Sequence, residues 1–96
     1  MIKSFGDKGT RDIYNGESSR YGRKIPELLH GKICRLLDQI NAAPTVEMLR
    51  VPPSNRLEKL KGNLKDYWSL RINDQWRIVF RWENSDAWEV RVTDYH

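Results

Sequence analysis

The strongest constraint on the fold is an alternating run of apolar residues between positions 68 and 82. The apolar positions are Trp68, Leu70, Ile72, Trp76, Ile78, Phe80 and Trp82. Period-two alternation predicts β-strands with one buried face. A three-residue loop at 73–75 keeps the two halves in phase, whereas a two-residue loop would place Arg71 opposite Trp76. The sequence therefore predicts an antiparallel hairpin in which Ile72 faces Trp76, Leu70 faces Ile78 and Trp68 faces Phe80.

A further strand is predicted at the end of the chain, where Trp88, Val90 and Val92 alternate in the same way. A five-residue loop at 83–87 preserves the parity of the apolar positions. The predicted pairs on the core face are Trp82 with Trp88, Phe80 with Val90 and Ile78 with Val92. On the other face the same register pairs Arg81 with Glu89 and Arg77 with Thr93. Opposite charges across a ladder contribute only about 0.2–1 kcal/mol, but they support this register.

The outer face of the predicted sheet is rich in arginine. Arg71, Arg77, Arg81 and Arg91 share its parity. A row of arginines is typical either of a solvated face or of a surface that binds an anionic partner. Arg81 has a predicted carboxylate partner, whereas Arg77 and Arg91 have none that is evident from the sequence.

The first half of the chain is predicted to be helical. Asp7 is placed to cap a short helix through Tyr14, and 15–16 (Asn-Gly) is a typical stop. A longer amphipathic helix is predicted from Pro26 to about Ala43. Its apolar stripe is Ile25, Leu28, Leu29, Ile33, Leu36, Leu37 and Ile40. A short strand at 2–5, a helical turn at 45–49 and an edge strand at 57–61 complete the prediction.

These elements predict one α+β domain over residues 1–96, in which a short N-terminal strand and two helices pack on one face of a C-terminal antiparallel sheet. The net charge of +4 permits nucleic-acid or acidic-protein partners. The single Cys34 suits a reducing cytoplasm. The sequence shows no signal peptide and no membrane span, so we expect a cytoplasmic protein without a membrane partner.

Few motifs for enzymatic chemistry are present. Two distant histidines and one cysteine match no metal-ligand spacing, and no glycine-rich phosphate loop or nucleophile elbow is found, so we expect no metal and no cofactor. His30 falls off the helical stripe and is expected at the surface. Tyr95 shares the parity of Arg77, while His96 ends the chain and Lys61 precedes the hairpin. Cations with tyrosine and histidine on one face suit phosphodiester chemistry.

Several motifs, read together, resemble one family. They are MIKSF at the start, LEKLKGN, YWSLRIND, QWRIVFRW, and DYH at the end. This order is similar to the HigB family of the RelE/ParE toxin superfamily. The resemblance implies a toxin of a type II toxin–antitoxin system, paired with a helix-turn-helix antitoxin (HigA-like). It also implies a metal-independent endoribonuclease that enters the ribosomal A site and cleaves mRNA there, where a 2′-hydroxyl attacks the neighbouring phosphate and leaves a cyclic phosphate.

The resemblance implies the catalytic residues, and the parity of the basic outer face adds candidates for RNA binding. The catalytic candidates are Lys61, Arg77, Asp94, Tyr95, His96 and Glu58, and the RNA-binding candidates are Arg71, Arg91 and Gln75. Lys61 and Arg77 would stabilise the phosphate, and Tyr95 or His96 would transfer protons. Glu58 stands where some relatives carry histidine, so the general base is either Glu58 or His96. Two other functions stay open, namely a ParE-like inhibitor of DNA gyrase and a non-catalytic binding module.

Overall fold

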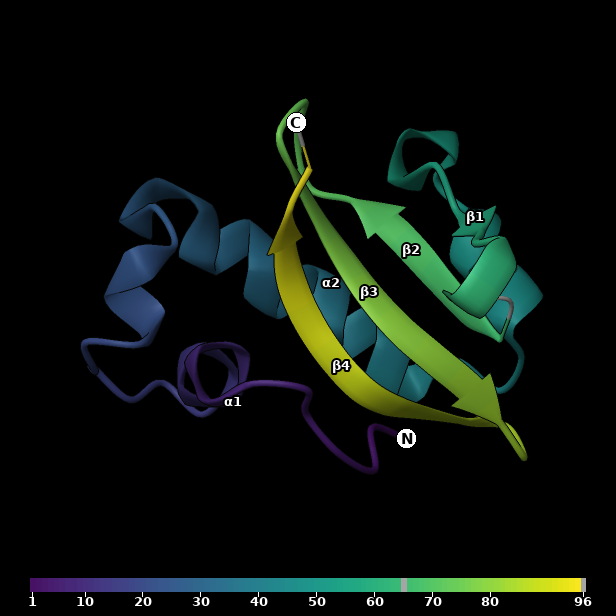
Figure 1. The fold of residues 1–96 in the computed structure, drawn as a ribbon, viewed down its shortest axis with the longest axis horizontal. Coiled ribbons are helices and arrows are strands. Elements are labelled where there is room, and N and C mark those ends of the chain that lie inside the picture. Colours follow the sequence, from purple (N-terminus) through teal and green to yellow (C-terminus); the bar gives the residue numbers. More distant parts are fainter. Residues whose placement is uncertain (65, 96) are drawn as a thin grey trace.

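The structure is a computed structural model that describes residues 1–64 and 66–95. Within this part of the chain, two α-helices, α1 (Lys8–Tyr14) and α2 (His30–Ala42), precede the sheet. The strands are β1 (Glu58–Lys59), β2 (Tyr67–Arg71), β3 (Trp76–Glu83) and β4 (Asp86–Asp94). They form one antiparallel sheet in the order β1-β2-β3-β4. α2 lies across one face of this sheet and α1 lies beside β4 (Figure 1), which confirms the predicted α+β architecture.

The N-terminal segment and α1 are attached to β4. Instead of a regular strand, Ile2 and Phe5 form isolated parallel bridges with β4. Asp7 caps α1 as predicted, because its carboxylate accepts a hydrogen bond from Thr10 N at 2.8 Å. The Thr10 hydroxyl in turn accepts the buried Val92 N–H at 2.9 Å. The helix therefore covers an edge of the sheet that would otherwise expose unpaired backbone groups.

The long helix begins later than predicted. α2 starts at His30 and follows a 3₁₀ turn at Glu27–Leu29, since Pro26 is extended rather than helical. The tighter 3₁₀ turn rotates its side chains off the α-helical stripe. Leu28 is consequently 98% exposed, so its assignment to the core was wrong. His30, which was expected at the surface, is half-buried instead, because its ring packs back toward the chain and its Nε2 lies 2.9 Å from the Ile25 carbonyl oxygen. The remaining stripe is buried at Ile33, Leu36, Leu37 and Ile40.

The segment between α2 and the sheet consists of short turns. The predicted helical turn at 45–49 is a 3₁₀ helix at Val46–Arg50, and further 3₁₀ turns lie at Gly22–Lys24, Pro53–Asn55 and Gly62–Leu64. The predicted edge strand is reduced to the two residues of β1. No helix in the described ranges is long and apolar enough to cross a membrane.

The first hairpin has the predicted register. Trp68 pairs with Phe80 and Leu70 with Ile78. Ile72 N donates to the Trp76 carbonyl at 2.9 Å, which closes the three-residue loop. The Asn73 carboxamide oxygen stabilises this loop, because it accepts hydrogen bonds from the backbone N–H groups of two loop-closing residues, Gln75 at 2.9 Å and Trp76 at 2.8 Å.

The second hairpin corrects the predicted pairing near its turn. Asn84 and Ser85 both have positive φ, 53° and 67°, and form a two-residue turn in place of the five-residue loop. Trp88 therefore pairs with Arg81 rather than with Trp82 and lies on the outer face, while Ala87 is buried instead. A bulge at Glu89, with φ 53°, then adds one residue. Beyond it, the predicted pairs of Ile78 with Val92 and Arg77 with Thr93 are confirmed.

The hydrophobic core lies between α2 and the inner face of the sheet. Phe80, Leu70, Ile72, Ile78 and Val90 are fully buried there. Three tryptophans, Trp68, Trp76 and Trp82, were predicted as core residues. They are half-buried and pack against the core from its rim.

Candidate active site

Arg77 is held on the outer face by contacts from two other segments of the chain. Its Nε donates to the Ser69 hydroxyl at 2.9 Å, and its Nη2 donates to the Arg56 carbonyl at 2.8 Å. The Glu58 carboxylate lies 3.8 Å from Nη2. Glu58 is therefore a carboxylate partner that was not evident from the sequence. The Arg77 side chain is only 12% exposed, so its guanidinium has a defined position between β1 and β2.

The C-terminal end of β4 brings a second candidate to Arg77. The Arg77 guanidinium carbon lies 6.0 Å from the ring centre of Tyr95. Tyr95 is 41% exposed, and its backbone N–H donates to the Gln75 carbonyl oxygen. The Gln75 side chain donates to the Asp94 carboxylate at 3.1 Å. The end of the chain thus lies beside the loop between β2 and β3 (Figure 1), as the register predicts.

The remaining predicted residues are more dispersed. Arg71 lies opposite Arg77 in the sheet and forms an ion pair with Asp74. Arg91 is exposed and lies opposite Val79. Lys61 is exposed and follows β1, near the end of the sheet where Leu60 N bonds to the Tyr67 carbonyl. Arg77 pairs at the other end of β2, so these contacts do not bring Lys61 beside it. His96 lies outside the described residues.

Arg81 occupies the other end of the outer face and is paired with carboxylates. Its guanidinium forms ion pairs with Glu83 and, at 3.1 Å, with Glu89. Glu89 also accepts a hydrogen bond from the Tyr67 hydroxyl at 2.9 Å. The hydrogen bonds from Arg81 and then Tyr67 hold the pKa of Glu89 below its usual range. These contacts confirm that Arg81 and Glu89 interact, although the bulge prevents them from pairing directly across the ladder.

Two residues of the Arg77 environment were not predicted. Ser69 is fully buried although it lies on the outer face, because the Arg77 side chain hydrogen-bonds across it. Arg56 adopts a left-handed conformation, with φ 45° and ψ 57°, and its carbonyl accepts from Arg77. A serine between Trp68 and Leu70 in a strand was a signal that could have identified Ser69. No local pattern identifies Arg56.

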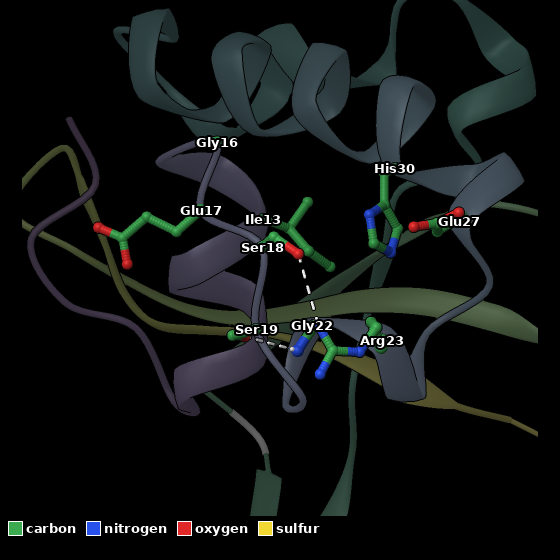
Figure 2. Close-up of a pocket in the computed structure, with 9 residues that line it drawn as sticks. All are labelled: Ile13, Gly16, Glu17, Ser18, Ser19, Gly22, Arg23, Glu27 and His30. Carbon is green, nitrogen blue, oxygen red and sulfur yellow. Dashed lines mark hydrogen bonds between the residues drawn. The ribbon is translucent and has the colours of Figure 1, made fainter.

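A separate cavity lies away from this cluster. Figure 2 shows it between α1 and the segment that leads into α2, with His30 and Arg23 in its lining. Its volume is about 250 Å³, and Arg23 donates to the Ser18 hydroxyl at 3.4 Å. None of the predicted site residues lines this cavity. In the part of the chain that is described, no group of three or more His, Cys, Asp or Glu side chains is arranged to hold a metal ion.

Solved structures with the same fold include bacterial toxins. The chain is similar to the YoeB–YefM toxin–antitoxin complex from Staphylococcus aureus, with a TM-score of 0.63 and 23% identity over 100% of this chain and 98% of that chain. It is also similar to a mutant of YafQ from E. coli, with a TM-score of 0.64 and 12% identity over 98% and 93% of the two chains. At these identities the likeness establishes the fold.

Sequence comparison establishes the family. A family model described as RelE-like toxin of type II toxin-antitoxin system HigB matches residues 3–96. Toxin HigB-1 of Vibrio cholerae is 39% identical over 91% of this chain and 90% of its own length. Endoribonuclease HigB of Proteus vulgaris is 33% identical over 100% of both chains. The chain therefore belongs to the HigB family of RelE-like toxins of type II toxin–antitoxin systems.

Proposed function

We propose that this toxin is a metal-independent endoribonuclease that cleaves mRNA in the ribosomal A site and so inhibits translation. A full-length relative at 33% identity is named as an endoribonuclease, which supports the reaction class. The observation that carries the proposal is the position of Arg77, a guanidinium held beside the exposed Tyr95. A fixed cation at such a place can stabilise the negative charge that a phosphate gains in the transition state.

The reaction is an internal transesterification of RNA. The 2′-oxygen of one nucleotide forms a bond to the adjacent phosphorus, and the bond from phosphorus to the 5′-oxygen of the next nucleotide breaks. A base removes the 2′-hydroxyl proton, and an acid supplies a proton to the leaving 5′-oxygen. The products are a 2′,3′-cyclic phosphate and a free 5′-hydroxyl. No outside reagent is consumed in this step.

The roles follow the family resemblance and the contacts around Arg77. Arg77 stabilises the charge on the phosphate, and Tyr95 and His96 are the candidates for proton transfer. Glu58 is the alternative general base, and its carboxylate lies 3.8 Å from Arg77 Nη2. Asp94 supports this end of the sheet through Gln75. Lys61, Arg71, Arg91 and Gln75 contact RNA outside the scissile phosphate.

Two partners and a compartment complete the proposal. An antitoxin partner follows from the family, and we propose that it is a helix-turn-helix protein of the HigA type. The ribosome is the second partner, because the substrate is mRNA in its A site. Translation takes place in the cytoplasm, which is therefore the proposed location.

The test is incubation of the purified toxin with ribosomes that are stalled on a defined message. Codon-linked cuts that end in a 2′,3′-cyclic phosphate are expected. Inhibited DNA supercoiling by gyrase, with intact message, would instead indicate a ParE-like gyrase inhibitor. Absence of both activities would indicate a binding module, and either result would overturn the proposal.

A further inference from the structure

Some residues around Arg77 hold its guanidinium in place and do not contact the substrate. Its Nε and Nη2 atoms form one edge of the guanidinium plane, and both donate to oxygen atoms of the chain. The two acceptors differ in sequence position, since Ser69 is in β2 and Arg56 precedes β1. Two bonds from two segments prevent the plane from rotating about the end of a flexible side chain.

Both acceptors are neutral, and this matters for an arginine that binds phosphate. A hydroxyl and a backbone carbonyl orient the guanidinium without cancelling its charge, and the nearby Glu58 carboxylate forms only a long ion pair with Nη2, at 3.8 Å. Nη1 belongs to the other edge of the plane and points away from the Ser69 side. Planar, fork-like donor geometry is what suits arginine to phosphate. A fixed inner edge therefore determines where the outer edge is presented.

Ser69 itself has two features that suit this contact. Serine is a small polar residue in a strand, where larger side chains normally pack. Its side chain is fully buried on the face that would otherwise meet solvent. Arg56 shows a related feature, because a non-glycine residue with φ 45° is in an uncommon conformation. Such backbone strain concentrates at functional sites.

We propose that Ser69 is a positioning residue for the cleavage reaction, and that its hydroxyl, with the Arg56 carbonyl, presents the Nη1 edge of Arg77 to the scissile phosphate. This inference rests on the proposed endoribonuclease function and names a further residue of the same site. Misplacement of a reacting group by about 1 Å can cost about 100-fold in rate. Ser69 acts through Arg77 and does not contact RNA.

The test compares Ser69→Ala with Ser69→Thr and with a control, Ser4→Ala. Ser4 also accepts one hydrogen bond, from Glu89 N at 2.8 Å, but it does not contact Arg77. Single-turnover cleavage by Ser69→Ala on saturating ribosome–mRNA complexes should be about 10- to 100-fold slower. Ribosome affinity should be unchanged, Ser69→Thr should restore the rate, and Ser4→Ala should cleave normally. NMR should show the Arg77 Nε–H signal exchanging faster with water in Ser69→Ala.

A double-mutant comparison separates this inference from the proposed function. In an Arg77→Gln background, Ser69→Ala should cause no further loss of rate. An equal further loss would show that Ser69 acts independently of Arg77 and would overturn the inference. A normal rate for Ser69→Ala, or unchanged Arg77 Nε–H exchange, would also overturn it. Undiminished cleavage by Arg77→Gln alone would instead remove Arg77 from the catalytic site of the proposed function.

Discussion

The two ends of the outer sheet face hold their arginines in different ways. Arg77 donates to a hydroxyl and to backbone carbonyls, with a carboxylate only at 3.8 Å. Arg81 instead forms ion pairs with both Glu83 and Glu89. The Arg77 side chain is 12% exposed and that of Arg81 is 27% exposed. One arginine is oriented by neutral oxygens, and the other is largely neutralised by charge.

This difference shows that a shared face does not mean a shared role. Parity places Arg77 and Arg81 on the same side of β3, but their partners decide which charge can serve an anionic substrate. Carboxylates already form ion pairs with Arg81, so a phosphate would have to displace them. The end of the sheet that carries Arg77 and Tyr95 is therefore the better candidate for RNA cleavage.

The largest expected effect concerns His96, which follows Tyr95 in the chain. Deletion of His96 removes a candidate proton-transfer group and should slow mRNA cleavage by about 10²–10⁴-fold. The measurement is single-turnover cleavage on ribosomes, with folding and ribosome binding determined separately. Undiminished cleavage would show that the terminal residue is dispensable, and Glu58 would become the better candidate for the general base.

Exchange of the two arginines for glutamine tests the comparison directly. Arg77→Gln should reduce the cleavage rate by about 10²–10³-fold, because a donor that stabilises transition-state charge is lost. Arg81→Gln removes ion pairs and a contact with the Trp88 ring, all within the protein, and should leave the rate unchanged. Cleavage assays with both variants at matched ribosome occupancy provide the measurement. Equal losses in the two variants would contradict the distinction between the two ends.

Two tryptophans provide the corresponding test of stability. Trp76 packs against the core from its rim, whereas Trp88 lies on the outer face beside Arg81. Trp76→Ala should lower the free energy of unfolding by about 3 kcal/mol, the lower end for core aromatic truncations because Trp76 is half-buried. Trp88→Ala should cost less, and urea unfolding measures both. A stable Trp76→Ala variant that lost only RNA cleavage would invert the assignment of the two faces.

Salt dependence distinguishes arginines that contact RNA from those that do not. Arg91 is exposed, and Arg91→Gln should reduce the slope of log K against log salt for ribosome binding by about 0.7–0.9, the value for one phosphate contact. Arg81→Gln should leave this slope unchanged. Binding titrations at several salt concentrations measure the slopes. An affinity of the natural chain that did not fall with salt would exclude an electrostatic contact with RNA.

The smallest expected effect is a pH dependence of folding stability, which arises at the end of the sheet that carries Arg81. Arg81 and Tyr67 lower the pKa of Glu89 in the folded state, so the charged carboxylate stabilises the fold above its unfolded pKa of about 4.3. This contribution is lost as the pH falls through the lower, folded pKa. Glu89→Gln should therefore melt slightly below the natural chain at pH 7, and the difference should shrink in acid. A difference that grew on acidification would contradict the assignment.

The register predicted from the sequence is correct for one part of β4 and wrong for the other. The predicted register holds from Trp76 to Val79, because period-two burial strongly specifies pairing wherever one face is covered. It fails near the turn, where Asn84 and Ser85 adopt positive φ and a bulge at Glu89 adds a residue. Two connections give the same parity beyond the bulge: a five-residue loop, or a two-residue turn that is followed by a bulge. The apolar pattern alone could not tell them apart.

The sequence by itself determined the family motifs, the first hairpin, the cap of α1 and the buried stripe of α2, because these depend on neighbours within a few residues. Only the tertiary structure decided how Arg77 is held. Its acceptors come from Ser69, eight residues away, and Arg56, 21 residues away. Contacts of that kind depend on how β1 and the turn before it pack against β2. Local propensity carries no information about such packing, because it acts through the backbone of adjacent residues.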